Sequence, residues 1–212
     1  EQHTAGVIDA LRFLREINLG NKSSPGKRVV VIGGGNVAID TARVTKRLGA
    51  ESVTVVYRRS EKEMPAYAEE IEGAKEEGVE FLFLTAPHRI CTEMGKVTGF
   101  ECLKTTLGPP DASGRRRPVP VEKSEFIIDC DGVIPAIGQD PELSFITEET
   151  GIEITRWNTV VTKFVPQKNA AGRDLNDDMG NPLSRVLITD MDGVFASGDA
   201  EIGPLTVVAC VG

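Results

Sequence analysis

The residues whose types and spacing could do chemistry are concentrated in one stretch of this chain, residues 29–60. An apolar run leads into Gly33-Gly34-Gly35, and the spacing Gly33-x-Gly35-x-x-Ala38 matches the G-x-G-x-x-G/A pattern of dinucleotide sites. In that pattern Gly33 permits a tight turn, Gly35 lets a pyrophosphate approach the backbone, and Ala38 lets a helix pack close to the strand. The helix N-terminus then offers N–H groups and partial positive charge to the phosphates. The stretch therefore predicts a bound dinucleotide.

Two arginines, Arg58 and Arg59, follow the second apolar run, about where a dinucleotide pattern usually has an acid that contacts the ribose 2′-hydroxyl. An arginine can instead pair through two hydrogen bonds with a 2′-phosphate. The pair therefore favours NADPH over NADH. Two structural alternatives stay open: a solvated strand end for the arginines, and a purely structural strand–helix turn for the glycines.

The flanking elements must position these residues. Helical spacing predicts a helix after the glycines, with Val37, Thr41, Val44 and Leu48 on one face. The other expected elements of a β-α-β-α-β order are a strand at Ser52–Tyr57, helices at Val7–Ile17 and Pro65–Glu77, and a strand at Val79–Leu84.

The pattern changes after residue 84. Short strands are expected at His88–Met94, Val97–Thr106 and Glu125–Ile128, with turns at Gly95-Lys96 and across Gly108–Pro118. These strands predict an antiparallel meander, and a buried strand at Asp131–Ile137 follows it. The fold class expected is α/β: a Rossmann-like three-layer FAD/NAD(P)-binding domain with a parallel sheet and an antiparallel β-meander. Arg115, Arg116 and Arg117 read as an exposed charged turn in preference to a phosphate site.

Composition excludes several classes of function. The chain has 212 residues and a net charge of −8, which argues against a general binder of nucleic acid or anionic membranes. No apolar run is long enough to span a bilayer, and no signal peptide is recognisable. The four cysteines are widely spaced without a C-x-x-C, so a redox disulfide, a zinc site and an iron–sulfur site are all disfavoured. We expect reduced cysteines in a cytoplasmic protein.

The last segment predicts part of a second site. Asp199 follows Gly198 after a short apolar run, and it could accept hydrogen bonds from a polyol or ribose. The backbone N–H groups near Leu205 and Thr206, at the start of an expected helix, would face an electron-rich ligand edge. An Asp that merely caps a turn is an equally good interpretation. The helix breaks off within a few residues, so we expect a fragment of a longer polypeptide.

Four stretches of the chain together resemble the glutamate synthase small (β) subunit family. They are VIGGGNVAIDTAR, VTVVYRRSEKEMPA, AIGQDP and GVFASGDAEIGPLTVV. That family includes related FAD-dependent NAD(P)H oxidoreductases and the flavin-containing part of dihydropyrimidine dehydrogenase. The resemblance covers nearly the whole chain and is weakest across Gly108–Pro118 and the polar stretch Gln167–Pro182. It implies that an NADPH domain is inserted into an FAD domain and that hydride passes from NADPH to FAD and then, as single electrons, through iron–sulfur clusters.

The resemblance also implies a set of cofactor-binding residues. They are Gly33, Gly34, Gly35, Asn36, Val37, Ala38, Arg58, Arg59, Ser60, Ala136, Ile137, Gly138, Gly198, Asp199, Leu205 and Thr206. The residues up to 38 would surround the NADPH pyrophosphate, the arginine segment would bind the 2′-phosphate, and residues 136–138 would lie beside the nicotinamide nucleotide. Residues 198 and 199 would contact the pyrophosphate–ribityl region of FAD, and residues 205 and 206 the isoalloxazine edge. No catalytic acid or base and no metal ligand is expected.

Two departures from the family limit these expectations. The chain has one glycine fingerprint, whereas the family needs another for the adenine half of FAD, and the cysteines for clusters are missing. We therefore expect a flank from the FAD domain at 1–26, an NADPH-binding domain at 27–140, and a partial return to the FAD domain at 141–212. Such a piece would bind NADPH, hold FAD poorly and be inactive alone. Its expected partners are the FAD domain of the same polypeptide and an iron–sulfur or large-subunit electron acceptor.

Two other functions remain open. The chain could be a non-catalytic NADP-binding sensor or scaffold, or an independent dehydrogenase. A Tyr-x-x-x-Lys arrangement is absent, because Glu61 and Ile71 stand four residues after Tyr57 and Tyr67. A disulfide reductase is disfavoured by the lack of a cysteine pair.

Overall fold

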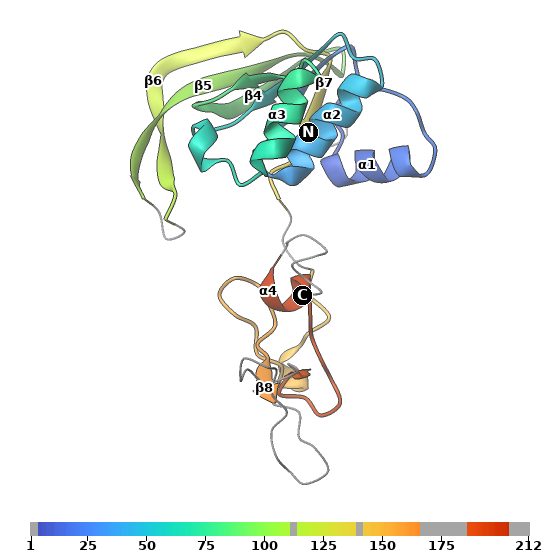
Figure 1. Cartoon of the computed structure of the whole chain (residues 1–212), viewed down its shortest axis with the longest axis vertical. Helices are drawn as coiled ribbons and strands as arrows, with labels where there is room; N and C mark the ends of the chain where they lie inside the picture. Colours follow the sequence, from blue (N-terminus) through green and yellow to red (C-terminus); the bar gives the residue numbers. More distant parts are fainter. Residues whose placement is uncertain (1–3, 111–113, 139–141, 166–185, 204–212) are drawn as a thin grey trace. The chain divides into compact units, whose positions relative to one another are not determined.

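The computed structural model describes residues 4–110, 114–138, 142–165 and 186–203 (Figure 1). The chain divides into two compact units, Glu1–Ile137 and Gly138–Gly212, and each is described by itself. No helix in the described residues is long and apolar enough to cross a membrane.

A parallel four-stranded sheet forms the centre of the first unit. Its strand order is β3-β2-β1-β7, and its strands are β1 (Arg28–Ile32), β2 (Ser52–Val56), β3 (Glu80–Leu82) and β7 (Gly132–Pro135). Both β1 and β2 are buried along almost their whole length. Continuous burial of this kind is typical of a parallel sheet that is covered on both faces, which explains the unbroken valine runs in the sequence.

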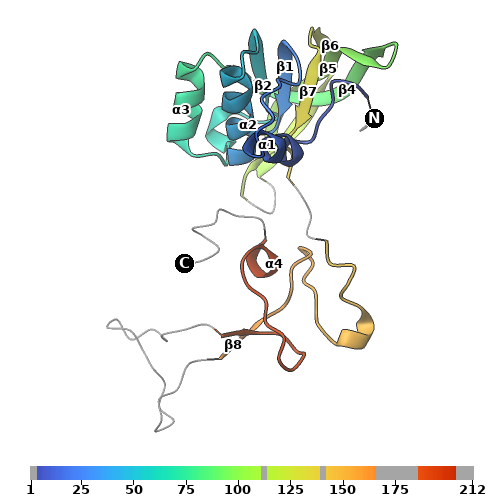
Figure 2. The ribbon, with the colours of Figure 1, turned by 90° about the vertical axis from the view of Figure 1, so that its right-hand side faces the viewer.

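One face of the sheet is covered by helices (Figure 2). They are α1 (Ala10–Asn18), α2 (Asn36–Arg47) and α3 (Ala68–Glu76). The most buried side chains of α2 include Ala38, Ile39 and Ala42, whereas Val37 is exposed and Val44 only partly buried. The expected helix is therefore present and Thr41 is buried as predicted, but Val37 lies outside the buried face, which includes the small residues Ala38 and Ala42. Small side chains allow α2 to lie close to β1 and β2.

The first helix begins later than its apolar pattern predicted. Asp9 caps α1 by accepting hydrogen bonds from the N–H groups of Leu11 and Arg12, so the helix starts at residue 10. Val7 lies outside the helix and forms a parallel β-bridge with Val133 of β7. The predicted start of this helix at Val7 is therefore wrong, and within the helix Ala10 and Phe13 are the residues buried in the core.

The other face of the sheet is covered by an antiparallel meander, in the order β4-β5-β6. These strands are β4 (Thr85–Glu93), β5 (Lys96–Pro110) and β6 (Arg116–Ile128). Val30, Ile32 and Val133 from the parallel sheet pack against Phe100 and Cys102 from β5. The expected three layers are thus confirmed: helices, a parallel sheet and a β-meander.

The turn predicted across Gly108–Pro118 is wrong in length, because most of this range belongs to β5 and β6. Thr106 pairs with Val119, and Leu107 pairs with Pro118, so the two strands continue through most of it. Pro118 and Pro120 lie on β6, and neither has an N–H group to donate to the sheet. Among the described strands β6 is at the edge of its sheet, where a missing N–H group is tolerated.

The second unit contains short elements. They are a 3₁₀ turn η2 (Glu148–Thr150), the antiparallel pair β8 (Lys163–Val165) and β9 (Val186–Ile188), and a four-residue helix α4 (Asp199–Ile202). The backbone N–H of Val160 donates to the carbonyl of Ala200 (2.7 Å), which ties α4 to the segment before β8. The polar stretch Gln167–Pro182 and the helix expected to start around Leu205 and Thr206 lie outside the described residues.

Candidate functional site

The carboxyl ends of three neighbouring parallel strands bring most of the predicted site together. The N–H of Gly33, after β1, donates to the carbonyl of Val56 at the end of β2 (3.1 Å). The N–H of Ala136, after β7, donates to the carbonyl of Ile32 (2.8 Å). The glycine loop therefore lies between the arginine segment on one side and Ala136 on the other. Ligands of parallel α/β sheets bind at this end of the strands.

The glycines of the loop differ in what they do. Gly33 has φ +146°, and a Cβ atom there would lie 2.3 Å from the carbonyl oxygen of Ala136. Gly35 is the N-cap of α2, with φ −89°, and a Cβ atom there would meet nothing within 4 Å. Gly33 is thus needed by the fold, whereas the backbone at Gly35 is open to a ligand. An open backbone beside the first-turn N–H groups of α2 fits a pyrophosphate.

Gly34 faces the protein rather than the open side. A Cβ atom there would lie 2.4 Å from the ring of Tyr57, and the carbonyl of Gly34 accepts from the N–H of Ala66 (3.2 Å). The hydroxyl of Tyr57 donates to the carbonyl of Glu63 (2.7 Å). The glycine loop is therefore packed against the segment that joins the arginines to α3.

The other two polar positions of the expected cradle are also fixed. The side-chain oxygen of Asn36 accepts a hydrogen bond from the N–H of Tyr67 (3.0 Å). Ser60 lies at the start of a 3₁₀ turn, η1 (Glu61–Glu63), where the carboxylate of Glu63 accepts from its N–H (3.2 Å) and its hydroxyl. Both side chains thus position the backbone around the site.

The two arginines lie in different environments. Arg58 is exposed to solvent, whereas Arg59 is buried, with only 5% of its surface exposed. The Nε of Arg59 donates to the carbonyl of Arg116 on β6 (2.7 Å), and the hydroxyl of Thr105 on β5 donates to the carbonyl of Arg58 (2.8 Å). These contacts of Thr105 and Arg116 were not predicted from the sequence, because no local pattern links residues this far apart along the chain.

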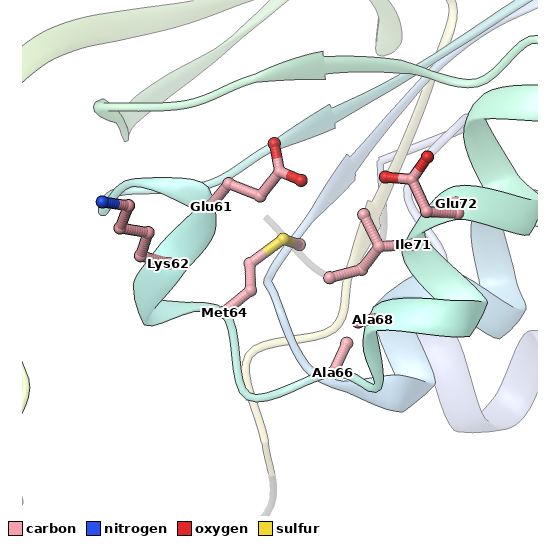
Figure 3. Close-up of a pocket in the computed structure, with 7 residues that line it drawn as sticks. All are labelled: Glu61, Lys62, Met64, Ala66, Ala68, Ile71 and Glu72. Atoms are coloured by element: carbon pink, nitrogen blue, oxygen red, sulfur yellow. The ribbon is translucent and has the colours of Figure 1, made fainter.

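A cavity of about 520 Å³ lies beside this segment, between η1 and α3 (Figure 3). Met64, Ala66 and Ile71 form its apolar part. The Nζ of Lys75 lies 2.8 Å from a carboxylate oxygen of both Glu61 and Glu72 at its rim. Besides its apolar wall, the cavity is lined by two carboxylates and one ammonium group, that of Lys62, a charge balance that does not suit a phosphate.

The clearest pKa shifts occur away from the glycine loop. Hydrogen bonds from Arg47 and Arg43 lower the pKa of Glu77 to about 2. Burial raises the pKa of the Cys102 and Cys130 thiols to about 12. These thiols and Cys91 are free, which leaves no disulfide among the cysteines that the structure describes.

The structure does not place the remaining predicted cofactor-binding residues at the glycine loop. Ile137 is 76% exposed at the end of the first unit, and Gly138 (φ +96°) begins the second. Gly198 (φ +61°) and the exposed Asp199, at the start of α4, also belong to the second unit. Leu205 and Thr206 lie outside the described residues.

Comparison with known protein families identifies the family to which the chain belongs. Residues 2–211 match the pyridine nucleotide-disulphide oxidoreductase family. The chain therefore belongs to that family, and its glycine loop, three layers and meander agree with this assignment.

Curated relatives carry related names. The chain is 65% identical over 208 residues to the NADPH-Fe(3+) oxidoreductase subunit beta of Geobacter sulfurreducens, covering 98% of this chain and 30% of that protein. It is 43% identical to the NADP(+)-dependent formate dehydrogenase subunit beta of Moorella thermoacetica (97% and 26% covered). It is 38% identical to the glutamate synthase [NADPH] small chain of Azospirillum brasilense (89% and 35% covered). The resemblance to the glutamate synthase small-subunit family is thus confirmed, and the chain spans about a third or less of each relative's length.

Solved structures support the fold. The chain is similar to thioredoxin reductase of T. acidophilum (TM-score 0.63, 20% identity, covering 97% of this chain and 53% of that one). It is equally similar to Mycobacterium tuberculosis FprA, solved in complex with NADPH (TM-score 0.63, 17% identity, 98% and 56% covered). At these identities the comparison bears on the fold alone, and it confirms the FAD/NAD(P)-binding fold class.

Proposed function

We propose that this chain is the NADPH-binding domain of an FAD-dependent oxidoreductase that passes hydride from NADPH to FAD. The observation that carries the proposal is the open backbone at Gly35, at the N-terminus of α2, with the exposed Arg58 on the neighbouring strand end. The names of the relatives, which include NADPH and NADP(+) subunits, support the choice of cofactor.

The chain's own residues would bind and orient the nucleotide. The first-turn N–H groups of α2, at Asn36 and Val37, would receive the pyrophosphate, and Ala38 keeps the helix close to the sheet. Arg58 and Arg59 would give the preference for a 2′-phosphate. Bound NADPH would supply a hydride from nicotinamide C4, so the protein needs to contribute positioning rather than an acid or base.

The domain organisation is part of the proposal. Residues 27–140 would form the NADPH domain, and residues 1–26 would be a flank and linker from the FAD domain whose helix α1 packs on the NADPH domain. Residues 141–212 would return to the FAD domain of a longer polypeptide. Gly198 and Asp199 would then be one side of a flavin site whose other side is absent from this chain. We accordingly propose that the chain alone retains little FAD and is inactive. Stoichiometric flavin in the purified chain, without added FAD, would refute this part.

The electron acceptor is proposed only by class. The relatives' names include an NADPH-Fe(3+) oxidoreductase, an NADP(+)-dependent formate dehydrogenase and a glutamate synthase, which supports a domain that would serve different partners in different proteins. One-electron carriers of the iron–sulfur type, or a large subunit that holds them, would connect the flavin to such different reactions. Glutamate synthesis itself is thus one candidate reaction for the full protein.

Titration with NADPH and NADH tests the cofactor assignment. We expect tighter binding of NADPH, and replacement of both Arg58 and Arg59 by Ala should weaken it by about 2–4 kcal/mol, because the arginine segment would no longer recognise the 2′-phosphate. NADH binding should change little. Arg12→Ala, which removes an exposed charge on α1, is the matched control. Equal losses for both nucleotides would rule out the 2′-phosphate assignment.

A further inference from the structure

Two hydrogen bonds fasten the β5–β6 ribbon, here residues 105–110 and 116–121, to the end of β2. The hydroxyl of Thr105 donates to the carbonyl of Arg58 (2.8 Å), and the Nε of Arg59 donates to the carbonyl of Arg116 (2.7 Å). Consecutive residues are thus bonded to both strands of the ribbon, which Figure 1 shows as long, curved, paired arrows. The tip of the parallel sheet and the ribbon are joined at the point where the two arginines leave β2.

The backbone carbonyls of both arginines accept hydrogen bonds, that of Arg58 from Thr105 and that of Arg59 from Leu84. The N–H of Leu84 donates to the carbonyl of Arg59 (3.0 Å), and the N–H of Thr105 donates to the carbonyl of Leu84 (2.7 Å). Leu84 has φ +51°, a left-handed conformation that a leucine keeps only when its surroundings hold it there. Arg58, which is exposed, therefore projects from a fixed backbone.

The side chain of Arg59 is already engaged within the protein. It is 5% exposed, which leaves little surface for the three oxygens of a phosphate. If the Arg59 side chain moved out to a phosphate, the partly buried carbonyl of Arg116 would lose its hydrogen bond from Nε, which is unfavourable. The guanidinium of Arg116 in turn donates to the carbonyls of Leu107 and Gly108 on β5, so the contact continues into the paired strand.

We propose that Arg59 is a positioning residue for 2′-phosphate selection, and that Arg58 makes the direct contact. This inference rests on the proposed NADPH function and divides the work of the two arginines. Arg59 holds the ribbon against the end of β2, and Thr105 holds the backbone of Arg58. A guanidinium on a fixed backbone loses less conformational freedom when it binds, so selectivity depends on both of these supports.

A double-mutant cycle in the full-length protein that carries this chain tests the division. The measured quantity is the selectivity, the Kd for NADH divided by the Kd for NADPH, in wild type, Arg58→Ala, Arg59→Ala and the double variant. We expect Arg58→Ala to lower the selectivity at least tenfold, and Arg59→Ala to lower it about three- to tenfold. In the Arg58→Ala background, Arg59→Ala should change it less than twofold, because its effect passes through Arg58.

Thr105→Val carries the test further, and it suffices if Arg59→Ala fails to fold. It removes one hydroxyl at constant shape, and it should lower the selectivity about threefold in wild type and leave it unchanged in the Arg58→Ala background. Losses that multiply in the double variant would mean that both arginines touch the phosphate and would overturn the proposal. So would a loss of NADH affinity as large as that of NADPH, which indicates a purely structural role. A wild type without preference for NADPH would instead remove the proposed function itself.

Discussion

The side-chain oxygen of Asn36 accepts a hydrogen bond from the backbone N–H of Tyr67 at 3.0 Å. This bond joins the first residue of α2 to the residue that precedes α3. Asn36 thus holds the segment after the arginines against the glycine loop while its own backbone N–H lies in the first turn of α2. Its side chain and its main chain have separate roles, and substitutions can separate them.

Asn36→Asp keeps the acceptor for Tyr67 and adds a negative charge at the N-terminus of α2. The fold should be as stable as wild type, because an acid at a helix N-terminus is favourable. Binding of NADPH and of NADH should weaken equally, by about 1.4 kcal/mol or tenfold, through repulsion of the pyrophosphate. Asn36→Ala is the complementary variant and should cost about 1 kcal/mol of unfolding free energy. Unchanged nucleotide affinity in Asn36→Asp, measured by calorimetry, would move the pyrophosphate away from this helix.

Two alanine substitutions in the glycine loop should have opposite effects. Gly35→Ala meets nothing within 4 Å, so we expect nearly unchanged thermal stability and a loss of both NADPH and NADH binding of at least tenfold. Gly33→Ala places a Cβ atom 2.3 Å from the carbonyl oxygen of Ala136 at φ +146°, and it should destabilise the fold by about 2–4 kcal/mol. Thermal melts and titrations with NADPH and NADH of the Gly33→Ala and Gly35→Ala variants test these two expectations. A Gly35→Ala protein that binds normally would contradict the cradle.

The parts of the fold that the sequence predicted are those with local signals. The glycine pattern and the buried valine runs predict the parallel strands and α2, and the alternating runs after residue 84 predict the meander. The length of the β5–β6 ribbon was not predictable in this way, because Pro118 and Pro120 are typical of turns. Their tolerance depends on the edge position of β6, which is a tertiary property.

The candidate site shows the same limit. Gly33 and Gly35 were identified by type and spacing, yet the sequence treats Arg58 and Arg59 as equivalent. Their difference arises from Arg116, which the meander brings to the end of β2. Contacts between residues so distant in sequence follow from packing of the layers and carry no local pattern.

The three cysteines that the structure describes should differ in reactivity. Burial raises the pKa of Cys102 and Cys130 to about 12, so at pH 8 only about 10⁻⁴ of each thiol would be the reactive thiolate. Cys91 on β4 is only half-buried. In the native protein at pH 8, iodoacetamide should therefore modify Cys91 well before the other two, as measured by peptide mass spectrometry. All three should react alike in guanidinium chloride. Equal native rates for Cys102 and Cys91 would indicate that the meander opens readily.

The ends of α2 and α3 are joined by a cluster of ion pairs around Glu77. Arg43 reaches its Oε1 with Nε at 2.9 Å and Nη2 at 2.7 Å. Arg47 reaches Oε2 with Nε at 2.9 Å and Oε1 with Nη2 at 2.5 Å. Arg43 also pairs with Glu70 on α3. The carboxylate of Glu77 is thus stabilised as an anion by two guanidinium groups, which accounts for its low pKa.

Glu77→Gln should lower the unfolding free energy by about 1 kcal/mol at pH 7, the value typical of partly exposed pairs. The pKa of Glu77 is lowered from 4.5 to about 2 in the folded protein, so between these values the unfolded chain binds the extra proton. The stabilisation is therefore complete above pH 4.5 and is lost as the pH falls towards 2. Urea unfolding of wild type and Glu77→Gln at pH 7, 4 and 3 should show the difference shrinking with acid. The exposed neighbour Glu76→Gln should show none at any pH, and a difference that is constant with pH would contradict the ion-pair origin.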